Sequence, residues 1–146
     1  MSESRKTLSI RTKSIFEPAF EEDGARYLIT RYHPRGIKKD HYDQWIRELS
    51  PSPELLFDYK EKRIDWEQFK ERLITELSTN IDSLEAINAL HNDMKWDNMT
   101  LLCFEKPGVP CHRYIIMDLI RDPKKLMLMK NSDNQKGRSV KLLVAD

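Results

Sequence analysis

The segment TLLCFEKPGVPCHRYII, residues 100–116, brings together residue types that readily do chemistry. It holds both cysteines of the chain, Cys103 and Cys111, and the second is followed directly by His112 and Arg113. A thiolate is a nucleophile, an imidazole moves protons near neutral pH, and a guanidinium binds anions. The segment is therefore our candidate for a functional site.

The second half of this segment is typical of a helix start. Pro110 suits the first helical position, and the residues before it offer no side-chain oxygen to cap the first-turn amides. A bound anion would satisfy those amides, and the same field would favour a thiolate at Cys111. The expected catalytic roles are nucleophile for Cys111, acid or base for His112, and orienting group or base for Glu105.

The same residues also have plainer explanations. Cys103 lies in an apolar run, where a free cysteine is typically a small core residue, and His112 could be a packing histidine. Cysteine and histidine also bind zinc, but their spacing here matches no structural zinc pattern, so no metal is predicted. A redox pair of Cys103 and Cys111 stays open if the chain brings them together, although C-x-x-C is absent. The cofactor is unknown.

A basic loop, TRYHPRGIKK at residues 30–39, provides the second part of the predicted site. Arginine is suited to bidentate binding of phosphate or carboxylate, so Arg31 and Arg35 are expected to join Arg113 in binding an anion. The predicted ligand is a phosphate-bearing small molecule such as a nucleotide. A solvated basic turn is the alternative.

The overall composition is that of a soluble globular protein of 146 residues with a net charge of only +1. That charge gives no general attraction for nucleic acid or for an anionic membrane, although the segment after residue 121 is locally basic. No apolar run could span a bilayer and no signal core is present, so a cytoplasmic location with reduced thiols is expected. A nucleic-acid-binding accessory domain and a structural or interaction protein remain alternatives.

The pattern of elements predicts an α/β fold, with a small, mostly parallel sheet flanked by helices. Strands are expected over 7–15, 25–32, 99–104, 126–129 and 140–145, and helices after Asp40, Ser52, Asp65, Asp82 and Pro110. One α/β domain would cover residues 1–121, followed by a basic extension over 122–146 that could end in an edge strand. Ligands of such sheets bind beyond the carboxyl ends of the strands, where loops 31–39 and 105–110 would lie.

Four segments in this order resemble the domain-of-unknown-function 488 family of YeaO-like proteins. They are LITRYHPRGIKK, WIRELSPSPEL, WEQFKERLITEL and TLLCFEKPGVPCHR, and together they cover residues 28–120. The resemblance implies a compact α/β domain but no particular activity. His33 stands where such proteins commonly carry tryptophan. The family's motif positions carried over to this sequence are Arg31, Pro34, Arg35, Gly36, Cys103, Glu105, Cys111, His112 and Arg113.

Overall fold

The computed structural model describes residues 9–105 and 110–126, which form a parallel sheet and four α-helices. The strands are β1 (Ile10–Ser14), β2 (Ala25–Leu28), β3 (Gln44–Trp45) and β4 (Met99–Cys103). The helices are α1 (Pro53–Lys60), α2 (Trp66–Ser78), α3 (Ile81–Asp93) and α4 (His112–Arg121), with 3-10 turns at Glu21–Asp23, Lys39–His41 and Arg47–Leu49. The strand order is β1-β4-β2-β3 and every pair is parallel, which confirms the α/β prediction.

Strand β4 lies inside the sheet because it is apolar apart from Thr100, whose hydroxyl donates to the Asp23 carbonyl. All five of its residues are buried, and its first residue, Met99, pairs with Ile10 of β1 on one side and Ala25 of β2 on the other. A continuous apolar run is typical of a parallel strand covered on both faces. The carboxyl ends of β1, β4 and β2 therefore lie at one edge of the sheet, and Cys103 stands at the middle one.

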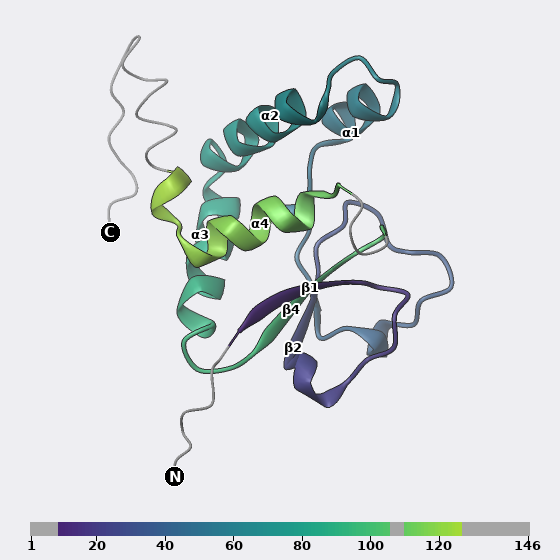
Figure 1. Cartoon of the computed structure of the whole chain (residues 1–146), viewed down its shortest axis with the longest axis vertical. Coiled ribbons are helices and arrows are strands. Elements are labelled where there is room, and N and C mark those ends of the chain that lie inside the picture. Colours follow the sequence, from purple (N-terminus) through teal and green to yellow (C-terminus); the bar gives the residue numbers. More distant parts are fainter. Residues whose placement is uncertain (1–8, 106–109, 127–146) are drawn as a thin grey trace.

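Different parts of the chain pack on the two faces of the sheet. Met99 and Leu101 belong to the large core that the helices close, and Figure 1 shows α1 to α4 gathered on one side of the sheet. Leu102 and Leu28 belong to a smaller core on the opposite face, which Trp45 and neighbouring loop residues cover. Side chains alternate along a strand, so Cys103 shares the face of Leu101 and points toward the helical layer.

The helix predicted after Asp40 is wrong. That segment forms two 3-10 turns and the short strand β3, although its apolar residues have helical spacing. The reason is pairing with β2: the Asp43 and Ile46 amides donate to the carbonyls of Arg26 and Leu28. Trp45 also donates its indole N–H to the Thr30 carbonyl, at 2.7 Å. These long-range bonds outweigh the local helical pattern.

Other boundaries follow local capping chemistry. Ser52 caps α1, and Asp65 with Gln68 forms the predicted capping box at α2. Helix α3 begins one residue before Asp82, because Asn80 accepts from the amides of residues 82 and 83. The two late strand predictions lie outside the described residues, apart from Leu126. No described helix has the length and apolarity needed to cross a membrane.

A buried ion network joins the start of β2 to β1. The Asp23 carboxylate is fully buried and accepts from the Lys13 ammonium at 2.9 Å, from the Arg26 guanidinium and from the Phe20 amide. Beside it, Gly24 has a φ of 68°, and a Cβ there would lie 2.1 Å from the Asn98 carbonyl oxygen. Glycine is therefore required where this turn approaches the start of β4.

Candidate functional site

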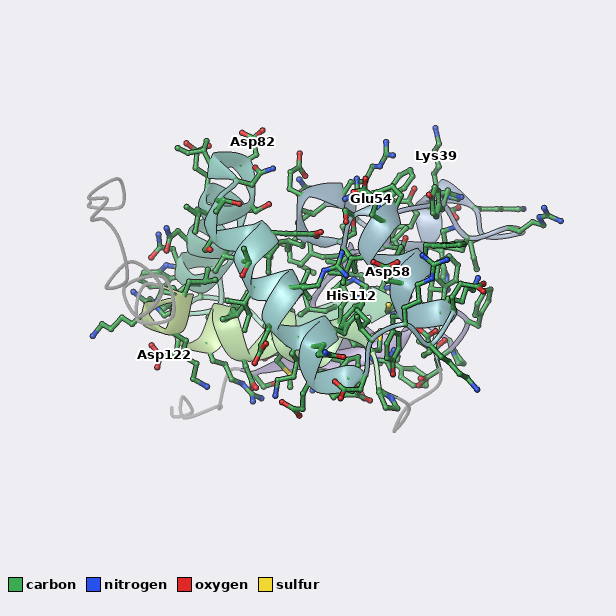
Figure 2. All side chains as sticks on the ribbon, turned by 90° about the horizontal axis from the view of Figure 1, so that it is seen from above. Lys39, Glu54, Asp58, Asp82, His112 and Asp122 are labelled. Atoms are coloured by element: carbon green, nitrogen blue, oxygen red, sulfur yellow. The ribbon has the colours of Figure 1, made fainter. Side chains whose placement is uncertain are left out.

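Two thiols and an imidazole meet at the carboxyl end of β4. The Sγ atoms of Cys103 and Cys111 are 2.8 Å apart, and the His112 Nδ1 atom lies 3.5 Å from the first and 3.7 Å from the second. All three side chains are buried, with exposed fractions of 2%, 5% and 6%. Figure 2 shows His112 in the middle of the molecule, whereas Lys39 projects from its edge. We call Cys103, Cys111 and His112 the dithiol–imidazole cluster.

The orientation of His112 is set by a main-chain group. Its Nε2 atom lies 2.6 Å from the Ile29 carbonyl oxygen, which can only accept a hydrogen bond. Nε2 therefore carries the proton, and in the neutral ring the Nδ1 lone pair faces the two sulfur atoms. Ile29 in turn donates its amide to the Leu102 carbonyl, so the same residue ties the imidazole to β4. The cluster thus has a ready proton acceptor next to both thiols.

Cys111 is the N-cap of α4, so Pro110 lies before the helix and the prediction that it occupies the first helical position is wrong. The Cys111 backbone is extended, its carbonyl accepts from the Tyr114 amide, and its side chain does not cap the helix. Its sulfur donates to Cys103 instead. This hydrogen bond and burial raise the pKa of Cys111, against a smaller lowering by His112. Cys111 is therefore a protonated thiol, and Cys103 is the sulfur that accepts from it.

Arg113 places a positive charge beside the cluster. Its side chain is fully buried and donates to the Glu105 carbonyl at 3.0 Å and to the Tyr114 hydroxyl at 3.2 Å. Burial lowers the pKa of Arg113, but the neighbouring Cys111 and Tyr114 outweigh this effect and raise it, so the guanidinium stays charged. A fixed positive charge near a sulfur favours its thiolate form.

The remaining predicted site residues lie farther from this arrangement. The Glu105 side chain is exposed, and it is the carbonyl of this residue that contacts Arg113. Arg31 donates to the carbonyls of Pro51 and Ser50, and it lines a surface pocket of about 650 Å³ that none of the cluster residues lines. Arg35 is exposed. The structure therefore brings Arg113 to the thiols, while Arg31 and Arg35 lie in the adjacent loop.

Sequence reasoning missed one part of the cluster and left another part open. The Ile29 carbonyl is a main-chain group, and no side-chain pattern indicates it. The partnership of Cys103 was treated as an open alternative because eight residues separate the two thiols. The useful signal was the alternation in β4, which places Cys103 on the face of Leu101 and hence toward α4.

Comparison with known proteins places this site in a family. A family model described as "Active DUF488-N3 subclade" matches residues 10–124, which include the whole cluster. The chain belongs to the DUF488-N3 family. This DUF488-N3 protein is also 30% identical over 116 residues to the uncharacterized protein YeaO of Escherichia coli. The aligned residues make up 78% of this chain and 98% of YeaO.

Another similarity covers only part of the chain. The uncharacterized protein Rv3073c of Mycobacterium tuberculosis is 33% identical over 72 residues, which are 47% of this chain and 59% of that protein. No solved structure gives a significant match. The family assignment therefore confirms the resemblance drawn from the four sequence segments, and the chemistry has to be argued from the cluster itself.

Proposed function

We propose that this DUF488-N3 protein carries a dithiol redox centre, in which Cys103 and Cys111 are reversibly joined with the help of His112. The observation that carries the proposal is the distance of 2.8 Å between the two sulfur atoms, with His112 Nδ1 within 3.7 Å of both. A disulfide has an S–S length of about 2.05 Å, so the thiols need to approach by less than about 1 Å. Deep burial favours reactants as small as a peroxide.

The three residues have distinct roles in this reaction. Cys103 is the nucleophile, because it accepts the S–H of Cys111 and lies beside the charged Arg113. His112 Nδ1 takes the Cys103 proton and leaves a thiolate next to an imidazolium. Cys111, whose pKa is raised, keeps its proton until the second step.

These groups can carry out the reaction with a peroxide in two balanced steps. The Cys103 thiolate attacks one peroxide oxygen; the S–O bond forms, the O–O bond breaks, and the leaving hydroxide takes the imidazolium proton to give water. The Cys111 sulfur then attacks the Cys103 sulfenic acid, forming the S–S bond, and the displaced hydroxide leaves as water with the Cys111 proton. Two thiols and one peroxide give one disulfide and two waters, and a small-molecule thiol can reverse the change.

A redox titration tests this proposal. The full chain is equilibrated with mixtures of reduced and oxidised glutathione, quenched with acid, and mapped by peptide mass spectrometry. We expect one two-electron transition that links Cys103 to Cys111, and a single glutathione adduct at Cys103 in the Cys111→Ser variant. Two independent glutathionylated thiols in the unmodified chain, with no internal disulfide, would contradict the proposal.

We propose as a second function that a phosphate-bearing small molecule binds beside the cluster. The loops after β2 and β4 leave the same sheet edge because these strands are parallel neighbours. Cys111 at the start of α4 makes no side-chain capping hydrogen bond, and Arg113 adds positive charge there. Arg31 and Arg35 would contribute from the neighbouring loop, and Glu105 would orient the ligand.

Calorimetric titration with inorganic phosphate and with a nucleoside monophosphate tests this second function. We expect binding that weakens about ten-fold in Arg35→Gln and stays unchanged in Lys70→Gln, which alters a charge on α2. Equal affinities in both variants would exclude a role for the loop. Binding of an oligonucleotide that weakens steeply with salt, without binding of the monophosphate, would instead favour the nucleic-acid-binding alternative.

A further inference from the structure

We propose that the dithiol–imidazole cluster also binds one thiophilic metal ion, with Zn²⁺ as the expected occupant. Cys103, Cys111 and His112 each offer one ligand atom, and these atoms all lie within 4.8 Å of one another. Cysteine sulfur and histidine nitrogen are the ligands that zinc prefers in proteins. The sequence spacing gave no sign of this site, because one ligand comes from a strand and the other two from a helix start.

Two of the three distances between the ligand atoms fit a tetrahedral metal ion. Bonds of about 2.3 Å to sulfur and about 2.05 Å to nitrogen, at tetrahedral angles, separate sulfur from nitrogen by about 3.6 Å and sulfur from sulfur by about 3.8 Å. The observed sulfur–nitrogen distances are 3.5 and 3.7 Å. The sulfur–sulfur distance of 2.8 Å would have to widen by about 1 Å when the ion binds.

The histidine is already prepared as a ligand. A metal-bound histidine commonly donates its second ring N–H to a carbonyl or carboxylate, which fixes the ring and its tautomer. Here Nε2 lies 2.6 Å from the Ile29 carbonyl oxygen, so that Nδ1 faces the sulfurs unprotonated. A histidine serving only to pack the core would not need to direct its lone pair at two thiols.

Charge and burial also favour a divalent ion at this position. Two thiolates in a site exposed by 5% or less would be costly without a counter-charge. A divalent cation neutralises both thiolates and removes that penalty. Among the described residues the cluster supplies three ligands, so the fourth position is left for an exchangeable small ligand, as in catalytic rather than structural zinc sites.

This inference rests on the same cluster as the proposed redox function and adds a means of regulating it. One pair of sulfurs cannot hold a metal ion and form a disulfide together. The sulfur–sulfur distance of 2.8 Å lies between the values of the two states, about 2.05 Å for the disulfide and about 3.8 Å for the metal site. Bound Zn²⁺ would therefore protect the thiols from peroxide, and oxidation would release the ion.

The test is a titration of the reduced full chain with Co²⁺ as a spectroscopic substitute, followed by Zn²⁺. We expect one Co²⁺ per chain, a sulfur-to-cobalt charge-transfer band in the near ultraviolet, visible bands of a tetrahedral ion, and displacement by one equivalent of Zn²⁺. Affinity should fall at least about ten-fold in Cys103→Ser, Cys111→Ser and His112→Ala. His91→Ala is the matched control, because His91 also contacts a carbonyl, that of Ile120, at 2.8 Å.

The outcomes separate the two proposals. No charge-transfer band in the unmodified reduced chain would overturn the metal site, whatever the variants show, and leave the dithiol chemistry standing if the internal disulfide forms. A band in a chain whose thiols never form the disulfide would support the metal site and overturn the redox function. A band that His91→Ala weakens as much as His112→Ala would overturn the assignment of the ligands.

Discussion

Replacing His112 with alanine is expected to slow oxidation of the dithiol by hydrogen peroxide about a hundred-fold at neutral pH. Nδ1 of this residue lies 3.5 Å from the Cys103 sulfur and faces it with its lone pair, so the variant loses the proton acceptor that generates the thiolate. A general base typically contributes a factor of about 10² to 10⁴. The rate is measured by stopping the reaction with acid and counting free thiols by mass spectrometry.

A pH profile distinguishes this role from a purely structural one. When the base is missing, the thiol must ionise alone, so the rate of His112→Ala should rise with pH and approach that of the unmodified chain in alkali. His91→Ala should keep the normal rate and profile, since His91 contacts the Ile120 carbonyl and is not part of the cluster. A folded His112→Ala variant that oxidises at the normal rate at neutral pH would show that His112 is not the base.

Replacing Asp23 with asparagine is expected to lower the free energy of unfolding by about 3–5 kcal/mol, since it leaves buried cations without their counter-charge. The Asp23 carboxylate is fully buried, and the side chains of Lys13 and Arg26 that donate to it are 11% and 8% exposed. Asparagine has nearly the same volume, so the loss measures charge rather than packing. Urea unfolding of the two proteins at neutral pH gives the difference.

The matched control is Asp58→Asn. Asp58 also pairs with two cations, Arg63 at 3.6 Å and Arg72 at 2.8 Å, but their side chains are 63% and 42% exposed. Such surface pairs contribute about 1 kcal/mol or less. Equal losses of unfolding free energy in Asp23→Asn and Asp58→Asn would show that burial does not increase the contribution of the Asp23 network to stability.

The stability difference should also depend on pH. Burial raises the pKa of Asp23, but hydrogen bonds from Phe20, Lys13 and Arg26 outweigh it and hold this pKa below its usual value of 3.8. A carboxyl group with a lowered pKa stabilises the fold fully above its unfolded-state pKa, and this contribution is lost as the pH falls through the folded-state pKa. The gap between the unmodified chain and Asp23→Asn should therefore be constant near neutrality and shrink below pH about 4.

Much of this fold could be predicted from the sequence, because the signals used depend only on residues that are close together in the chain. The apolar run of β4, the Ser52 cap and the Asp65–Gln68 capping box each depend on neighbouring residues, and all three are present. The helix predicted after Asp40 failed because its backbone groups pair with β2, about 17 residues away in the sequence. Helical periodicity carries no information on such long-range pairing.

The candidate site could likewise be predicted only in part. The residue types at 103, 111 and 112 indicated chemistry, but the partner of each sulfur depended on how the end of β4 meets the start of α4. The field at the helix start, together with Arg113, was expected to favour a thiolate at Cys111. The Cys103 sulfur at 2.8 Å and burial reverse that expectation, because both raise the pKa of Cys111. Side-chain neighbours at such distances outweigh a helix dipole.

The most direct test of the dithiol centre is peptide-mapped mass spectrometry of the native reduced chain after one equivalent of hydrogen peroxide. The geometry predicts a mass loss of two hydrogens per chain and a single cross-linked pair, Cys103 with Cys111, with the disulfide lost again after addition of a small-molecule thiol. A chain that keeps both thiols, or that accumulates stable sulfinic acid at either cysteine without the cross-link, would contradict it.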